Sequence, residues 1–117
     1  MIDERAVDLG RLIGQTEEYK ALRRAHERVK EQQPLQDQMG RLHAVAEQLE
    51  RAAGEGREPE EALVQEYDHL LGLIQADARY QAVIAAQSNF DKLMLRVNEQ
   101  IMDGIRRGAA SPIITLS

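Results

Sequence analysis

The chain of 117 residues contains no cysteine. Disulfides, thiolate nucleophiles, zinc–thiolate sites and cysteine-held iron–sulfur clusters are therefore impossible within it. Aromatic residues are almost as scarce, because the sequence holds three tyrosines, one phenylalanine and no tryptophan. The core must be built from Leu, Ile, Val, Ala and Met. Such a core suits helices, where the small and unbranched side chains among these lose little entropy.

Long apolar runs are also missing. No stretch approaches the roughly 18 residues that a membrane-spanning helix needs. The first ten residues, MIDERAVDLG, have neither the basic nor the apolar region of a signal peptide. The length corresponds to one domain. We therefore predict a single cytoplasmic domain without a membrane span.

Charge is distributed unevenly along the chain. The net charge is −5, but residues 47–68 hold eight acids against Arg51 and Arg57, so the rest of the chain sums to +1. A chain this acidic does not attract nucleic acid through its overall field. The basic residues between positions 20 and 30 are interleaved with acids, which leaves little net field there. We therefore predict no direct nucleic-acid contact.

Apolar residues recur every three or four positions almost throughout, which predicts helices. Gly14 is placed to end a first helix in the left-handed conformation, and Thr16 to cap a second one. The apolar face of the first helix is Ile2, Ala6, Leu9 and Ile13. That of the second is Tyr19, Leu22, His26 and Val29, flanked by Ala21 and Ala25.

Pro34 suits the first position of a third helix. The apolar residues of that helix follow heptad-like steps of 4, 3, 4, 3 and 4: Leu35, Met39, Leu42, Ala46, Leu49 and Ala53. The segment GEGREP (54–59) predicts a loop, with Gly54 or Gly56 as the C-cap and Pro59 opening the next helix. The fourth helix then carries Leu63, Tyr67, Leu70 and Ile74.

Asp77 is positioned to cap a fifth helix that runs to about Arg107. Its stripe is Val83, Gln87, Phe90, Met94, Val97, Ile101 and Ile105. Some thirty residues at 1.5 Å each span roughly 45 Å, which exceeds the diameter of roughly 26 Å expected for a compact chain of this length. The helix must therefore project or meet a partner chain.

The predicted fold class is thus all-α, a small bundle of about five helices with a long C-terminal helix paired with a second chain. Residues 1–108 form the helical domain. Residues 109–117 form a tail, in which Pro112 blocks helix formation. We expect this tail to be disordered, with a short strand or a segment docked on a partner as the alternatives.

One motif suggests enzyme chemistry. Glu66 and His69 form a Glu-x-x-His pair, the ligand unit of di-iron carboxylate bundles. Such sites need a second unit, and neither His26 nor His43 has an acid three residues before it. We therefore predict surface positions for Glu66 and His69, with no catalytic residue, metal site or cofactor. His26 stays open between a core histidine and a partner-facing hydrogen-bonding group.

Two longer segments resemble the YlbF/YmcA family of bacterial regulators. Residues 6–29, AVDLGRLIGQTEEYKALRRAHERV, are similar to its N-terminal pattern of a short amphipathic helix, a polar link and a Thr-x-Glu-Tyr motif. Residues 70–105, LLGLIQADARYQAVIAAQSNFDKLMLRVNEQIMDGI, are similar to its C-terminal half, in which a helix break leads into a long helix. The resemblance covers about residues 5 to 105.

The resemblance implies an all-α fold whose long helices associate in pairs, and a non-catalytic role. It also implies participation in competence, sporulation and biofilm control, through a protein complex that influences messenger-RNA processing by an endoribonuclease. Some family members are linked to iron–sulfur clusters held by cysteines. That property does not carry over, because this chain has no cysteine.

Two function classes stay open. The first is a regulatory adaptor, a homodimer or a hetero-oligomer with a paralogue, that also binds other proteins of a regulatory complex. The second is a small helical chaperone or structural spacer that grips unfolded or filamentous clients. The adaptor hypothesis places the interface at Tyr19, Leu22, Met39, Leu42, Leu49, Phe90, Met94, Val97, Ile101 and Ile105.

Met94 and Val97 lie in the middle of the predicted stripe of the fifth helix. A glutamate at either position would place a charge without a partner in an apolar contact, which is strongly unfavourable. We expect Met94→Glu or Val97→Glu to abolish association, as measured by sedimentation at low micromolar concentration. A variant that stays as associated and as stable as the parent would show that the stripe is assigned to the wrong residues.

Overall fold

The computed structural model describes residues 1–110, and these residues form five α-helices without a strand. The helices are α1 (Ile2–Gly14), α2 (Glu17–Lys30), α3 (Gln33–Gly54), α4 (Glu61–Ala76) and α5 (Ala78–Ala110). The predicted all-α class with a long C-terminal helix is confirmed. α5 continues three residues beyond the predicted end at Arg107. The prediction of a tail over residues 109–117 lies, from Ser111 onward, outside the described residues.

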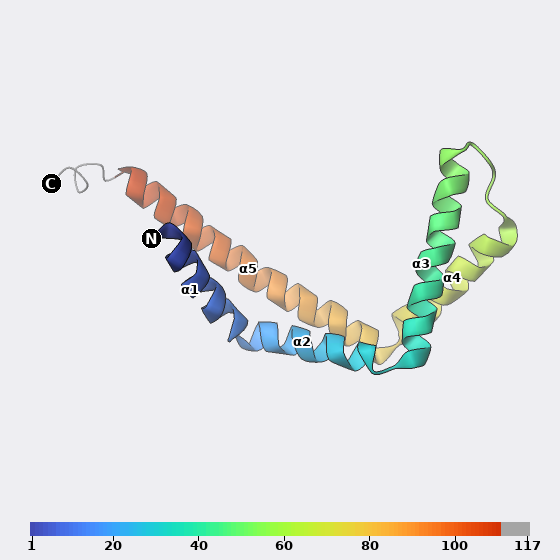
Figure 1. Ribbon diagram of the computed structural model, residues 1–117, viewed down its shortest axis with the longest axis horizontal. Coiled ribbons are helices and arrows are strands. Elements are labelled where there is room, and N and C mark those ends of the chain that lie inside the picture. Colours follow the sequence, from blue (N-terminus) through green and yellow to red (C-terminus); the bar gives the residue numbers. More distant parts are fainter. Residues whose placement is uncertain (111–117) are drawn as a thin grey trace.

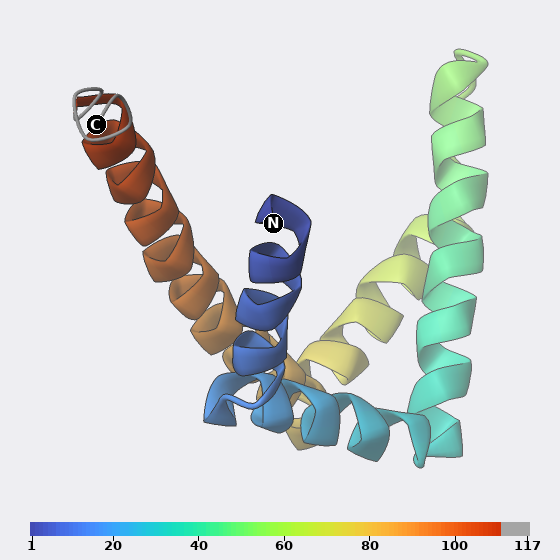
Figure 2. The ribbon, with the colours of Figure 1, turned by 60° about the vertical axis from the view of Figure 1, so that its left-hand side comes forward.

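The helices form two arms that meet at a vertex (Figure 1). α1 and α2 accompany α5 in one arm, and α3 and α4 pair as a hairpin in the other; Figure 2 shows the two arms diverging. The molecule measures 71 × 37 × 20 Å, with a radius of gyration of 21.8 Å. A compact chain of this length would have a radius of about 13 Å. A single chain of this shape leaves much of its helix surface uncovered.

The corner between α1 and α2 differs from the prediction at one residue. Gly14 does not adopt the left-handed conformation, since Gly56 is the one residue with positive φ among residues 1–110. The amides of Gln15 and Thr16 instead donate to the carbonyls of Leu12 and Ile13. The Thr16 hydroxyl donates to the Ile13 carbonyl at 2.6 Å and accepts from the Tyr19 amide at 3.2 Å. Thr16 is the N-cap as predicted, and these bonds end α1 without a left-handed residue.

The hairpin arm turns where the sequence predicted a glycine C-cap. Gly56 has φ 69°, and its amide donates to the Ala53 carbonyl at 3.2 Å. The Arg57 amide donates to the Ala52 carbonyl at 2.8 Å, which completes a Schellman motif. The acidic stretch 47–68 occupies the outer part of this arm, from the last turns of α3 to the first half of α4.

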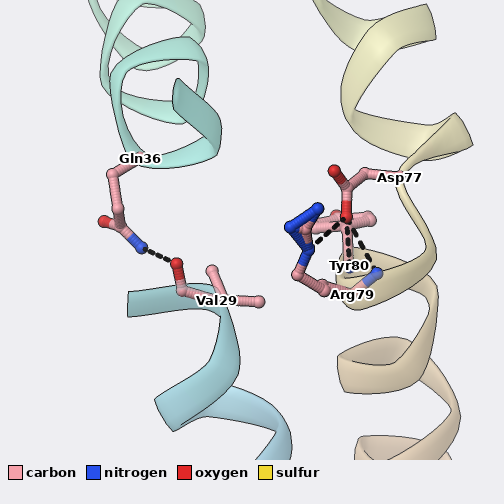
Figure 3. A network of polar contacts seen from close by, with 5 residues as sticks. All are labelled: Val29, Gln36, Asp77, Arg79 and Tyr80. Carbon is pink, nitrogen blue, oxygen red and sulfur yellow. Dashed lines mark hydrogen bonds and ion pairs between the residues drawn. The ribbon is translucent and has the colours of Figure 1, made fainter. Parts of the chain in front are cut away.

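The vertex is held by two polar corners (Figure 3). Where α2 meets α3, the Val29 carbonyl accepts from the Gln36 side chain at 3.0 Å and from the Gln32 amide at 3.1 Å, so this carbonyl at the end of α2 is fully paired. Asp77 alone connects α4 to α5. Its carboxylate accepts from the Arg79 amide at 2.8 Å and from the Tyr80 amide at 3.4 Å, so the predicted N-cap is confirmed.

The buried core is small and divided along the molecule. Val29, Leu35 and Ile74 form one cluster at the vertex, where α2, α3 and α4 meet. Leu22, Ala25 and Ala86 form a second cluster between α2 and α5. Val45, which is 0% exposed, lies in the hairpin arm with Ala52 and Leu70. No buried residue lies in α1.

The stripes of α2 and α3 differ in part from the prediction. His26 is exposed, so its interpretation as a core histidine is wrong; the buried face of α2 is Leu22, Ala25 and Val29. In the outer half of α3, Val45 and Ala52 are buried in place of Ala46 and Ala53. The buried face of α3 rotates along the helix, because its first turns pack at the vertex and its later turns pack against α4.

Ile74 is 2% exposed at the vertex, where it contacts residues of α2 and α3. Its truncation leaves a cavity at the junction of the two arms. We expect Ile74→Ala to lower the free energy of unfolding by about 2–5 kcal/mol in urea titrations followed by circular dichroism. Ile2→Ala, at a side chain that is 83% exposed, is the control and should stay within about 0.5 kcal/mol of the parent. Equal losses for both variants would contradict this assignment of the core.

Candidate protein-interaction surface

α2 covers only the first half of α5. The rings of Tyr19 and Phe90 pack at a tilt of 57°, with their centroids 5.7 Å apart. Toward the N-terminal end of α2, the Glu18 carboxylate and the Arg96 guanidinium approach within 3.6 Å. α2 begins at Glu17. The last turns of α5 therefore extend past the helix that covers its first half.

The uncovered part of α5 carries exposed apolar side chains. Ile101, Met102 and Ile105 are 44%, 48% and 58% exposed. α1, which continues from the start of α2, is equally uncovered, with Val7 52% and Leu12 64% exposed. Exposed apolar side chains are common singly, but a contiguous group of them marks a contact surface.

A cleft of about 460 Å³ separates α1 from α5. Leu9 lines it from α1, and Leu93, Arg96, Val97, Gln100 and Ile101 line it from α5. We call this the α1–α5 cleft. Four of its lining residues are aliphatic, and the two polar ones are Arg96 and Gln100. An open apolar groove between helices is the shape that accepts the apolar face of a further helix.

The ten residues predicted for an interface fall into three groups. Leu22 is buried within the chain, and Tyr19 and Phe90 pack on each other between α2 and α5. Four more are half-buried along α3 and in the middle of α5: Met39, Leu42, Leu49 and Met94. Val97 and Ile101 line the α1–α5 cleft, and Ile105 is exposed beyond it. The interface prediction stays a prediction for all ten residues.

Four residues were missed, of which Leu9 is half-buried and the other three are exposed. Leu9 was assigned to a helix face but not to an interface, and Ile84, Leu95 and Met102 were not assigned at all. These last three are 53%, 59% and 48% exposed on α5. The sequence does contain a pattern that could have found the last three. Ile84, Leu95 and Met102 each follow a residue of the predicted stripe of α5 (Val83, Met94 and Ile101), so they repeat with the same helical spacing.

The family described as "Control of competence regulator ComK, YlbF/YmcA" has a sequence model that matches residues 2–106. The chain belongs to the YlbF/YmcA family. The match begins at the first residue of α1 and ends in the last turns of α5, so it includes the surface described above. No curated protein and no solved structure matches the chain. The family resemblance seen in residues 6–29 and 70–105 is thereby confirmed.

Glu66, the acid of the Glu-x-x-His pair, has a different partner in this YlbF/YmcA member. Both oxygens of Glu66 accept hydrogen bonds from Arg41 at 2.7 Å, which ties α4 to α3. His69 is exposed, and the Glu66 side chain is 37% exposed, so both reach the surface as predicted. Within residues 1–110, no group of three or more His, Asp or Glu side chains is arranged to hold a metal ion.

No helix within residues 1–110 is both long enough and apolar enough to cross a lipid bilayer.

The Arg41–Glu66 pair predicts a pH dependence. Hydrogen bonding by Arg41 lowers the pKa of Glu66; desolvation opposes this shift, and the attraction of the guanidinium adds to it. A carboxylate with a lowered pKa stabilises the fold above its ordinary titration range, and this contribution is lost as the pH falls through the lowered pKa. We expect Glu66→Gln to reduce the fall in the urea midpoint between neutral and acidic pH.

Glu50→Gln is the matched control, because Glu50 is an exposed residue of α3. It should leave the pH profile close to that of the parent. Identical profiles for Glu66→Gln and the parent would show that the Arg41–Glu66 pair does not persist in solution.

Proposed function

We propose that this chain is a non-enzymatic regulatory adaptor of the cytoplasm that acts through helix–helix contacts with other proteins. Its partners are a second copy or a paralogue, together with further proteins of a regulatory complex. Direct contact with nucleic acid is not part of the proposal, in keeping with the acidic net charge of −5. The family's described role, control of a competence regulator, supports regulation as the purpose of these contacts.

The observation that carries the proposal is the α1–α5 cleft. Leu9 approaches it from one side, and Val97 and Ile101 from the other. α1 is held mainly at its C-terminal end, through its corner with α2. A partner helix in this cleft would remove apolar surface of both helices from water, at roughly 25 cal/mol per Å². We infer that the cleft is where a partner of the regulatory complex binds.

The regulated process is proposed from the family resemblance. The adaptor would modulate messenger-RNA processing by a ribonuclease and thereby affect competence, sporulation or biofilm formation. Because the chain contains no cysteine, it would do so without binding a cysteine-held iron–sulfur cluster of its own.

Co-purification from the native host, followed by mass spectrometry, tests the proposal. We expect the parent chain to retain a few defined partners, including a ribonuclease, and Ile101→Glu to lose them, because burying a carboxylate under the apolar face of a partner is unfavourable. Leu73→Glu is the control, since Leu73 lies on α4 and is 42% exposed, close to the 44% of Ile101. A broad set of unfolded clients would favour a chaperone instead. Partners that survive Ile101→Glu would contradict the cleft as the binding surface.

A further inference from the structure

α1 carries an apolar stripe in which no residue is buried. Its members follow steps of 4, 3 and 4 residues: Ile2, Ala6, Leu9 and Ile13. Ile2 is 83% exposed, and Leu9 and Ile13 are half-buried. Because Leu9 lines the α1–α5 cleft, the stripe is the side of α1 that is turned toward α5.

α5 presents a matching line on the other side of the cleft. Leu93, Val97 and Ile101 line the cleft from α5. Gly104 lies on the same face, since it follows Ile101 by three residues and Val97 by seven. A Cβ atom added to Gly104 would meet no neighbouring atom within 4 Å. The space above this part of α5 is therefore open.

The two lines are complementary in length and direction. α1 runs in the opposite direction to α5, as Figures 1 and 2 show. We align Leu9 with Val97, because both line the cleft. The pairs that follow from this alignment are Ile13 with Leu93, Ala6 with Ile101, and Ile2 with Gly104. The small residues Ala6 and Gly104 would let the two helices approach closely.

The rest of the chain holds α1 by few contacts. Its connection to α2 is the corner at Gln15 and Thr16, whose amides donate to carbonyls at the end of α1 itself. Asp8 and Arg11 pair with each other within α1. Among residues 1–110, no side-chain hydrogen bond or ion pair joins α1 to α5. A helix with no buried residue separates from its neighbours at low cost in free energy.

We propose that α1 is a movable cover for the α1–α5 cleft. It turns about the corner at Gln15 and Thr16 between the open position of Figure 1 and a closed position, in which its stripe packs on α5. Closure removes Leu9, Val97 and Ile101 from water, and this burial stabilises the closed position.

The cover would regulate the binding of the partner. This inference rests on the proposed adaptor function, because it assigns the partner to the same cleft. A partner helix and closed α1 require the same residues of α5, so the partner binds only the open chain. Its apparent affinity is then reduced by the fraction of chains that are open. α1 thus sets how tightly the adaptor binds.

Disulfide trapping tests closure, because a chain without cysteine gives no background. Leu9→Cys with Val97→Cys should form an intramolecular disulfide under mild oxidation, since closure brings their Cα atoms within about 7 Å. Val7→Cys with Val97→Cys is the matched control, because Val7 is 52% exposed and lies on the opposite side of α1 from Leu9. It should react at least about tenfold more slowly. Equal rates, or no disulfide between positions 9 and 97, would refute the closed position.

Binding of the apolar dye ANS shows whether the disulfide closes the cleft. The oxidised Leu9→Cys, Val97→Cys chain should bind less dye than the same chain after reduction, because closed α1 covers Ile101 and its neighbours. Equal dye binding before and after reduction would show that the disulfide forms without closure. That result would refute α1 as a cover.

The locked chain also separates the cover from the adaptor. In the co-purification from the native host, oxidised Leu9→Cys, Val97→Cys should lose the partners and recover them on reduction. Partners that are lost in Ile101→Glu but kept by the locked chain would leave the adaptor standing and refute the cover. Locking with reduced dye binding, together with partners that survive Ile101→Glu, would support the cover and count against the cleft as the partner's site.

Discussion

The packing of α2 against the first half of α5 is the contact on which the rest of the structure depends. It brings together helices that are separated by the 47 residues 31–77, and it aligns one arm of the molecule. Ala25 and Ala86 supply small side chains beside the larger Leu22, and the Tyr19–Phe90 ring pair also packs between the two helices. Aromatic pairs of this kind contribute about 0.5–1.5 kcal/mol beyond the area they bury. In a chain with four aromatic residues, half of them are used at this one contact.

Because α5 is much longer than α2, their contact leaves part of α5 uncovered. α2 has 14 residues and α5 has 33, so more than half of α5 has no counterpart in α2. The corner at Thr16 turns α1 away from α5. The α1–α5 cleft therefore lies between them, and α1 does not extend the covering of α5 that α2 begins. The arm that holds α1, α2 and α5 therefore ends in apolar surfaces that one chain does not hide. A partner protein, a second copy or the closing of α1 onto α5 can each remove such surfaces from water.

The hairpin arm has a different character. Its helices pack on each other, and the Arg41–Glu66 pair joins them with two hydrogen bonds of 2.7 Å. The concentration of acidic residues at its outer part keeps that part hydrated. The hairpin thus contributes a self-contained unit at the vertex, whereas the other arm carries the exposed apolar faces that the proposed function requires.

The sequence by itself determined the helix count, the caps at Thr16 and Asp77, the turn at Gly56 and the family. These are local properties, set by spacing and by hydrogen bonds over a few residues. Only the tertiary structure decided that His26 is exposed, that Val45 and Ala52 replace Ala46 and Ala53 in the core, and that α1 stands away from α5. Helical periodicity shows that a face is apolar but not which helix covers it, or whether any does. Only the position of α2 could show that Ile101 and Ile105, on the predicted stripe of α5, stay exposed, because α2 does not reach them.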